Sequence, residues 1–248
     1  MKKALILPVL FLVVNVYGQN NYFKLESEEK LLSESLFNQR FKILVKQLPS
    51  DYTLTPIIFH KRKGQDSIIN YIAFQKIWWG NLKIDSSKFN IVYKQDPLYL
   101  LVDNKLPEFK LKDINGNIFT SSSLIGKPTL IDFWDTHCRG CILEMPELNK
   151  LKDKYKEEIN FVAISYDPLD TAVNFLKRKK FDFYHLVEGG NYARNILKIS
   201  GIPVNIFIDR NGYVREIHKM MPADPDKPFP SLSNQLFDKL LEKLTKEL

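Results

Sequence analysis

Glycine and cysteine are scarce in this chain, which has 10 glycines and two cysteines among 248 residues. Because no segment reads G-x-x-x-x-G-K or G-x-G-x-x-G, the sequence argues against a P-loop or a dinucleotide-binding fold. Two cysteines are too few for a disulfide-stapled framework, and they exclude a zinc site made of four cysteines. The remaining composition, with 44% hydrophobic and 26% charged residues, is that of a globular protein with enough apolar residues for a core.

The first eighteen residues have the pattern of a cleavable signal peptide. Lys2 and Lys3 precede an apolar run over residues 4–16, and Val16-Tyr17-Gly18 places small or modest residues at a cleavage position. The run is shorter than the ~20 residues that cross a bilayer, which favours cleavage over a membrane anchor. No cysteine follows it, which argues against a lipoprotein. We expect residues 1–18 to be a signal peptide and the mature protein to be exported, periplasmic or otherwise extracytoplasmic, and soluble.

Residues 19–104 predict a small α/β or β-rich module without recognisable chemistry. Apolar residues recur at mixed helical spacing over residues 28–46, which predicts a helix. Two runs rich in β-branched and aromatic residues, 53–60 and 67–74, predict strands, and residues 63–66 between them predict a hairpin turn.

Residues 105–248 alternate the patterns of strands and helices. A hairpin with an Asn-Gly turn is expected over residues 109–119. The strands expected after it are 129–134, 159–165, 181–186, 204–208 and 213–217, and the expected helices are 141–156, 169–179, 192–199 and 232–248. This order predicts an α/β fold in which helices flank a mixed central sheet.

Both cysteines lie in the segment DFWDTHCRGC, as Cys138 and Cys141, between a buried-type strand and a helix. Unpaired N–H groups and the dipole at a helix N-terminus stabilise a thiolate. The first sulfur of such a pair is exposed and attacks a disulfide, and the second resolves the mixed disulfide. The alternative is an inert structural disulfide, which would close a very small loop and therefore constrain the unfolded chain little.

From Leu106 onward, over about 140 of the 248 residues, the chain resembles thioredoxin-fold disulfide oxidoreductases of the TlpA/ResA type. The resemblance rests on LPEFKLKDINGN, GKPTLIDFW, CRGCILEMPEL and GIPVNIFIDRNG, which occur in the family's order and spacing. It implies a thioredoxin-like fold, Cys138 as the nucleophile and Cys141 as the resolving thiol. Pro203 matches the family's cis-proline, beside which the Ile202 backbone would pair with an extended substrate segment.

Two acids near the cysteines also match the wider family. Asp132 lies six residues before Cys138, where thioredoxins carry a buried acid, and a buried carboxyl with a raised pKa could take the proton from Cys141. Glu144, three residues after Cys141, matches a glutamate of some family members. The alternatives are a hydrogen-bonded strand residue for Asp132 and a solvent-facing first-turn acid for Glu144.

The chain departs from the family pattern around the first cysteine. His137 stands where tryptophan is usual, Arg139-Gly140 replaces Gly-Pro or Glu-Pro, and Asp135 replaces a small residue. The basic side chains favour the Cys138 thiolate and the acidic ones oppose it, so the redox direction stays open at this point. Trp134, His137 and Arg139 are expected beside the substrate.

A metal carrier is the main competing interpretation. His137, Cys138 and Cys141 could bind Cu(I) or zinc, with His185 or His218 as a distant ligand. Copper carriers of this fold space their cysteines C-x-x-x-C, however, one residue wider than here. A haem attachment motif is absent, because no histidine follows Cys141 directly.

Two further alternatives come from different classes. Thr136 lies two residues before Cys138, near the place of a peroxidatic threonine, but the proline that should precede it by four is replaced by Asp132. A non-catalytic adaptor would instead use the first module to bind a partner, and its function would survive replacement of both cysteines by serine.

We interpret the chain as an exported thiol–disulfide oxidoreductase that acts on protein disulfides, with reduction as the favoured direction. The resemblance implies re-reduction by a membrane-linked electron donor. We expect no organic cofactor and no metal. Removal of Lys2 and Lys3 lowers the formal net charge from +7 to +5, a mild excess that argues against nucleic-acid binding.

Overall fold

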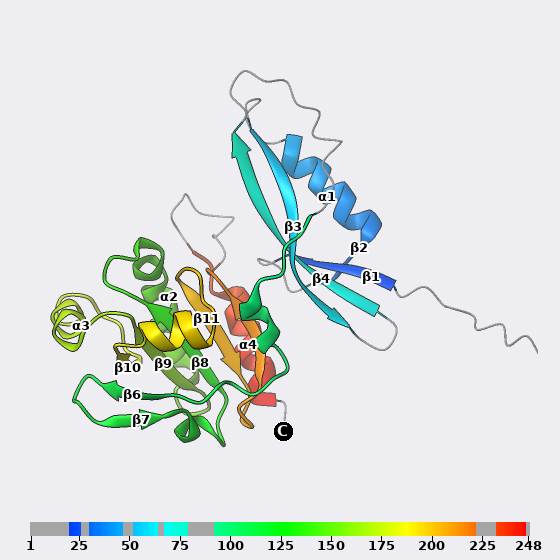
Figure 1. The fold of residues 1–248 in the computed structure, drawn as a ribbon. Helices are drawn as coiled ribbons and strands as arrows, with labels where there is room; N and C mark the ends of the chain where they lie inside the picture. The colour runs from blue at the N-terminus through cyan, green and yellow to red at the C-terminus, as the bar shows by residue number, and fades with distance from the viewer. Residues whose placement is uncertain are drawn as a thin grey trace, which may run out of the picture.

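The computed structural model describes residues 20–25, 30–46, 52–63, 67–78, 92–221 and 232–246. Two β-sheets lie side by side in this part of the chain (Figure 1), one of five strands and one of seven. The signal peptide expected at residues 1–18 and most of the hairpin turn expected at 63–66 lie outside the described residues. Within the described ranges, no helix has the length and apolarity needed to cross a membrane.

The first sheet forms the N-terminal module and has the strand order β2-β1-β4-β3-β5. Its elements are β1 (Asn20–Leu25), β2 (Leu32–Ser33), α1 (Glu34–Lys46), β3 (Tyr52–Lys63), β4 (Ser67–Trp78) and β5 (Val92–Tyr93). The predicted hairpin of β3 and β4 is present as an antiparallel pair. The predicted helix starts later than residue 28, at Glu34, because Leu32 and Ser33 pair with β1.

A small aromatic core holds α1 against this sheet. Phe37 of α1 is buried and stacks on Phe23 of β1, with ring centroids 4.6 Å apart. Phe41 and Phe74 extend the stack, at a centroid distance of 5.8 Å from each other. Stacked aromatic side chains bury a large apolar area in a module too small for a wide core.

The second sheet has the order β12-β11-β8-β9-β10-β6-β7 and contains both parallel and antiparallel pairs. Its strands are β6 (Lys110–Asp113), β7 (Ile118–Thr120), β8 (Thr129–Trp134), β9 (Asn160–Ser165), β10 (Tyr184–Val187), β11 (Val204–Ile208) and β12 (Val214–His218). Its helices are α2 (Arg139–Tyr155), α3 (Leu169–Leu176) and α4 (Gln235–Lys246), with a π-helical turn at Tyr192–Ile196. The predicted mixed sheet flanked by helices is confirmed.

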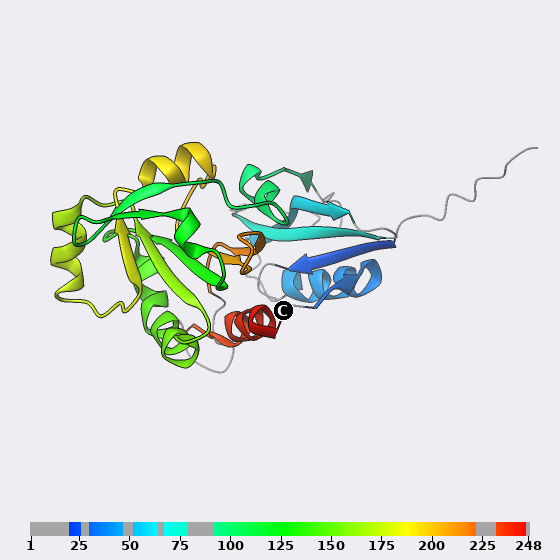
Figure 2. The same ribbon diagram turned by 90° about the horizontal axis from the view of Figure 1, so that it is seen from below.

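The central strand β8 is buried on both faces, and its side chains alternate between two cores. Leu130 and Trp134 pack in the cluster under α2 and α4, whereas Ile131 and Phe133 pack on the other face with the turn at Tyr192–Ile196. Figure 2 shows α2 and α4 on one side of the sheet and this turn on the other. Because neighbouring strand residues point to opposite faces, Asp132 points toward α2.

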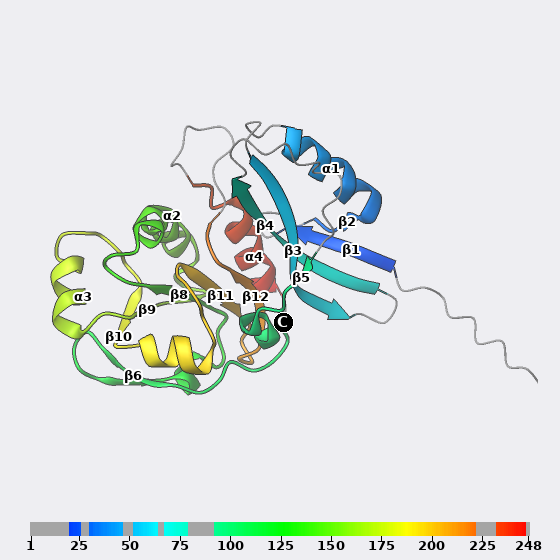
Figure 3. The same cartoon turned by 45° about the horizontal axis from the view of Figure 1, so that its top comes forward.

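The N-terminal module packs beside β12, the edge strand of the second sheet (Figure 3). Phe59 of β3 and Tyr71 of β4 join the same hydrophobic cluster as Val214 and Ile217 of β12. Tyr99, in the short 3₁₀ helix η2 (Pro97–Leu101), also belongs to this cluster. The two modules therefore share one core, while the boundary expected between residues 104 and 105 stays a prediction.

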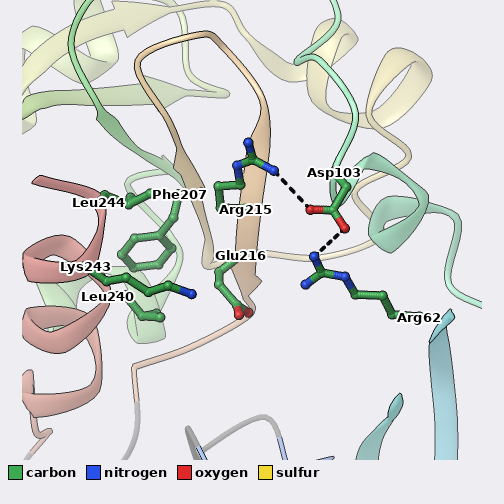
Figure 4. Close-up of a pocket in the computed structure, with 8 residues that line it drawn as sticks. All are labelled: Arg62, Asp103, Phe207, Arg215, Glu216, Leu240, Lys243 and Leu244. Atoms are coloured by element: carbon green, nitrogen blue, oxygen red, sulfur yellow. Dashed lines mark hydrogen bonds and ion pairs between the residues drawn. The ribbon is translucent and has the colours of Figure 1, made fainter. Parts of the chain in front are cut away.

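Charged side chains also cross between the modules (Figure 4). Arg62 of β3 and Arg215 of β12 contact the two carboxylate oxygens of Asp103, at 2.7 and 3.3 Å. These groups are partly exposed, so we expect each pair to contribute little. The Lys24–Glu216 pair, 2.7 Å long, is more shielded, with 9% and 19% of the side chains exposed. It is therefore the ion pair that fixes β1 against β12.

We predict that Lys24→Met lowers the free energy of unfolding by about 2 kcal/mol, because Glu216 then keeps its charge in a shielded site without its counterion. Lys150→Met is the matched control, since Lys150 is 65% exposed in its pair with Glu147. The control should change stability by less than about 1 kcal/mol. Urea unfolding of both variants measures the difference, and equal effects would contradict the role given to Lys24.

Candidate functional site

The two cysteines lie at the start of α2 and form a disulfide, with the sulfurs 2.00 Å apart. Cys138 is the N-cap of the helix, and its Sγ accepts a hydrogen bond of 3.1 Å from the backbone N–H of Cys141. Cys138 is half-buried, whereas Cys141 is only 1% exposed. The helix N-terminus thus offers Cys138 both an N–H donor and a favourable dipole, which stabilise a thiolate at that sulfur.

A proline loop packs against the cysteine loop. The Ile202–Pro203 peptide bond is cis, as the resemblance implied. A Cβ atom added at Gly140 would lie 3.1 Å from Pro203 Cδ and 3.9 Å from Met220 Cε. The glycine between the cysteines therefore lets Pro203 and Met220 approach the cysteine loop closely.

The loop before Cys138 is held by backbone hydrogen bonds to two carboxylates. The N–H of His137 donates to Asp135 Oδ1 at 2.8 Å, and the N–H of Thr136 donates to Asp167 Oδ2 at 2.7 Å. His137 and Arg139 have exposed side chains on either side of Cys138. The sequence analysis did not identify Asp167. Because β9 is parallel to β8 and ends just before Asp167, this residue lies at the same edge of the sheet as the cysteine loop.

The acids Asp132 and Glu144 lie close together inside the protein, and both are buried. Asn205 of β11 lies opposite Asp132 of β8, and its Nδ2 donates a hydrogen bond of 3.0 Å to Glu144 Oε2. The N–H of Met221 donates to Glu144 Oε1. The alternative interpretation of Glu144, a solvent-facing acid of the first helical turn, is therefore wrong. Asn205 is a second site residue that the sequence analysis missed.

Both carboxyl groups have raised pKa values. Burial raises the pKa of Asp132 well above its ordinary value, and the nearby Glu144 raises it further. Burial raises the pKa of Glu144 to about 7, although the hydrogen bonds from Met221 and Asn205 lower it. Oδ1 of Asp132 has no hydrogen-bond partner among the described residues. Two such carboxyls disfavour each other's charge, so the pair holds a proton near neutral pH.

The expectation that Trp134 contacts substrate is wrong for its side chain. Trp134 is fully buried behind α2. Its ring lies 5.4 Å from that of Phe175 and 5.9 Å from those of Phe181 and His185, measured between centroids. Side chains alternate between the two faces of β8, and that of Trp134 lies on the face that packs under α2. It therefore packs beneath the site and does not line its surface.

The three-ligand metal site weighed in the sequence analysis is not formed within the described ranges. No three side chains of histidine, cysteine, aspartate or glutamate gather there in a metal-binding arrangement. His185 Nε2 is 2.7 Å from the carbonyl oxygen of Phe181. His218 packs edge-on against Phe207. The rings of both candidate distant histidines thus pack against aromatic side chains.

Comparisons with known proteins agree with this architecture. Residues 102–217, which include both cysteines and Pro203, match the model of the AhpC/TSA family. A solved structure described as the thiol:disulfide interchange protein DsbE from Chlorobium tepidum aligns with a TM-score of 0.51 at 23% identity. The alignment covers 58% of this chain and 97% of that one, and it supports the thioredoxin fold of the second module.

Two curated relatives have the same name. The thiol-disulfide oxidoreductase ResA of Bacillus cereus is 31% identical over 117 residues, which are 46% of this chain and 68% of the relative. ResA of Oceanobacillus iheyensis is 32% identical over 130 residues, 50% of this chain and 68% of the relative. The resemblance found in the sequence begins at Leu106, so it does not include the first module. On these matches and the CxxC site, the chain belongs to the ResA family of thiol-disulfide oxidoreductases.

Proposed function

We propose that this oxidoreductase is exported and reduces the disulfides of other proteins. The observation that carries the proposal is the position of the cysteine pair. Cys138 presents a half-buried sulfur at the N-terminus of α2, and Cys141 lies buried one helical turn further on. Next to Cys141 on the helix is Glu144, part of a buried acid pair. This arrangement separates an attacking sulfur from a resolving sulfur that needs a base.

The proposed reaction starts from the reduced protein. The Cys138 thiolate attacks one sulfur of the substrate disulfide, and the other substrate sulfur leaves and takes up a proton. The Cys141 thiolate then attacks Cys138 Sγ in the mixed disulfide, which releases the second substrate thiol and forms the Cys138–Cys141 disulfide. Two electrons and two protons pass from protein to substrate. A membrane-linked electron donor then returns the pair to the dithiol form.

The buried acids serve the second step. Burial disfavours the thiolate of Cys141, so its attack requires that the thiol proton be moved. Glu144 lies three residues further along the same helix, which places the two side chains on one helix face. With a pKa of about 7, Glu144 exchanges protons in the physiological range. Asp132 would act through Glu144, because the Glu144 charge raises the pKa of Asp132 and so keeps that carboxyl protonated beside it.

The loops around Cys138 would hold the substrate. Ile202 is half-exposed beside Pro203. Its backbone would pair with an extended segment that carries the attacked cysteine. Met220, which lies against Gly140, is 38% exposed and offers an apolar contact. His137 and Arg139, whose side chains are exposed, flank Cys138 in the chain. Export is inferred from the signal pattern at residues 1–18.

The reduction potential of the Cys138–Cys141 pair tests the direction of the reaction. For a reductase we expect about −250 mV or lower, measured by equilibration of residues 19–248 in thiol–disulfide buffers. A value of about −120 to −180 mV would instead indicate an oxidant or an isomerase. If the two thiols never form a disulfide, the redox function itself is contradicted.

We predict that Cys141→Ser traps substrate and that Cys138→Ser does not. In Cys141→Ser, attack by Cys138 still occurs, but no thiol remains to resolve the mixed disulfide. The reduced variants are mixed with a disulfide-bonded model protein, and the adducts are measured by intact-mass spectrometry. If Cys138→Ser formed the adduct and Cys141→Ser did not, Cys141 would be the attacking thiol and Cys138 the resolving one.

The resolving step should depend on pH through Glu144. A carboxylate is available to take the Cys141 proton only above its pKa, so we expect the rate of this step to rise with pH and to level off above about 7. Glu144→Gln should lower the plateau by about 10- to 100-fold and remove the inflection. Glu147→Gln on the same helix is the control. Stopped-flow release of the second thiol measures the profile, and an unchanged profile in Glu144→Gln would contradict the role.

A further inference from the structure

A groove of about 590 Å³ lies between the two modules. Strands β3 and β4 of the first module give it an apolar wall with Ile57, Phe59 and Ala73. The opposite wall belongs to the second module and contains Lys198, Ser200 and Lys219. Neither module forms this groove alone, and nothing in the reaction described above uses it.

The groove adjoins the loops that surround the active disulfide. Ser200 lies two residues before Ile202, and Lys219 directly precedes Met220, whose side chain lies against Gly140. Asn205 near the start of β11 pairs with His218 at the end of β12, so the loops before β11 and after β12 leave the sheet at the same end. The groove therefore begins next to Ile202 and Met220.

The rim of the groove is positively charged. Lys94, Lys198 and Lys219 line it together with one acid, Asp96. Lys219 pairs with Asp96 at 2.7 Å. Lys94 and Lys198 are exposed, and neither has an ion-pair partner among the residues that the structure describes. Two lysine charges on the rim thus remain for a bound molecule.

We propose that this groove binds the segment of the substrate protein next to the cysteine under attack, and that it selects segments with acidic and apolar residues. The inference rests on the proposed function, because it assigns the specificity of the same site. Lys94 and Lys198 would attract the acidic side chains, and Ile57 and Ala73 would take an apolar one. The groove volume lies within the range of natural binding pockets, about 300–1,000 Å³. The N-terminal module thereby acts as a substrate-selecting wall.

Two peptides of equal length test the preference. Each has one cysteine in a mixed disulfide with 5-thio-2-nitrobenzoate, flanked by leucine and by either two glutamates or two lysines. Reduced protein converts each peptide to its free thiol and releases the coloured thiol, while Cys138 and Cys141 become a disulfide. The quantity compared is the ratio of the rate constants for the acidic and the basic peptide within one protein variant, so changes in the reactivity of Cys138 cancel.

The test variant is Lys94→Glu/Lys198→Glu. Its matched control is Lys42→Glu/Lys110→Glu, which changes the net charge equally at exposed lysines of α1 and β6 that do not line the groove. For the wild type and the control, we expect the acidic peptide to react about tenfold faster at low salt. The test variant should lower this ratio to one or below. In 0.5 M salt the wild-type ratio should also fall toward one.

Each outcome is decisive. A wild-type ratio near one would contradict the proposal that the groove selects the substrate segment, and so would an equal ratio in the test variant and the wild type. Neither result would contradict the proposed disulfide reductase activity. A loss of preference in the control would show that overall charge, and not the groove, selects the peptide. If the wild type reduces neither peptide, the proposed function fails, and the inference fails with it.

Discussion

The chemistry of this protein depends on the burial of β8 on both of its faces. Strand alternation sends Trp134 and Asp132 toward α2, and it sends Ile131 and Phe133 into the opposite core. The strand ends just before the cysteine loop, so the depth of β8 sets the depth of Cys141. Asp132 is then a carboxyl that cannot reach water, and its proton affinity follows from that position. The acid pair is a consequence of where the strand lies.

Much of the second module could be predicted from its sequence, because the patterns there are local. Apolar runs predicted its strands. The C-x-x-C spacing between a strand and a helix identified Cys138 and Cys141 as a candidate redox pair. The resemblance supplied Pro203, since a cis bond has no local signature of its own. Helix spacing placed Glu144 near Cys141, but it left open whether that acid faced solvent. Only the packing of Asn205 and Met221 around Glu144 decides this.

Other features depend on contacts between distant parts of the chain. Trp134 was expected beside the substrate, whereas the pleat of β8 places its side chain in the core. Asp167 and Asn205 come from strands next to β8, and their roles require the strand order of the sheet. The groove needs both modules, and no pattern within either one indicates that β3 would lie beside Lys219.

The segment that joins the modules also pairs with the start of β12, the edge strand of the second sheet. Val102 forms a β-bridge with Val214 of β12. The N–H of Asp103 donates to the carbonyl of Val214, the N–H of Val214 to that of Asn104, and the N–H of Leu106 to that of Gly212, at 2.8 to 2.9 Å. A thioredoxin domain cut at residue 105 would lose the pairing of residues 102–104 with Val214, at the start of the edge strand β12. Bare edges recruit strands from other molecules. The connecting segment thus covers part of an exposed strand edge, and a shortened protein retains this cover when it keeps residues from 97 onward.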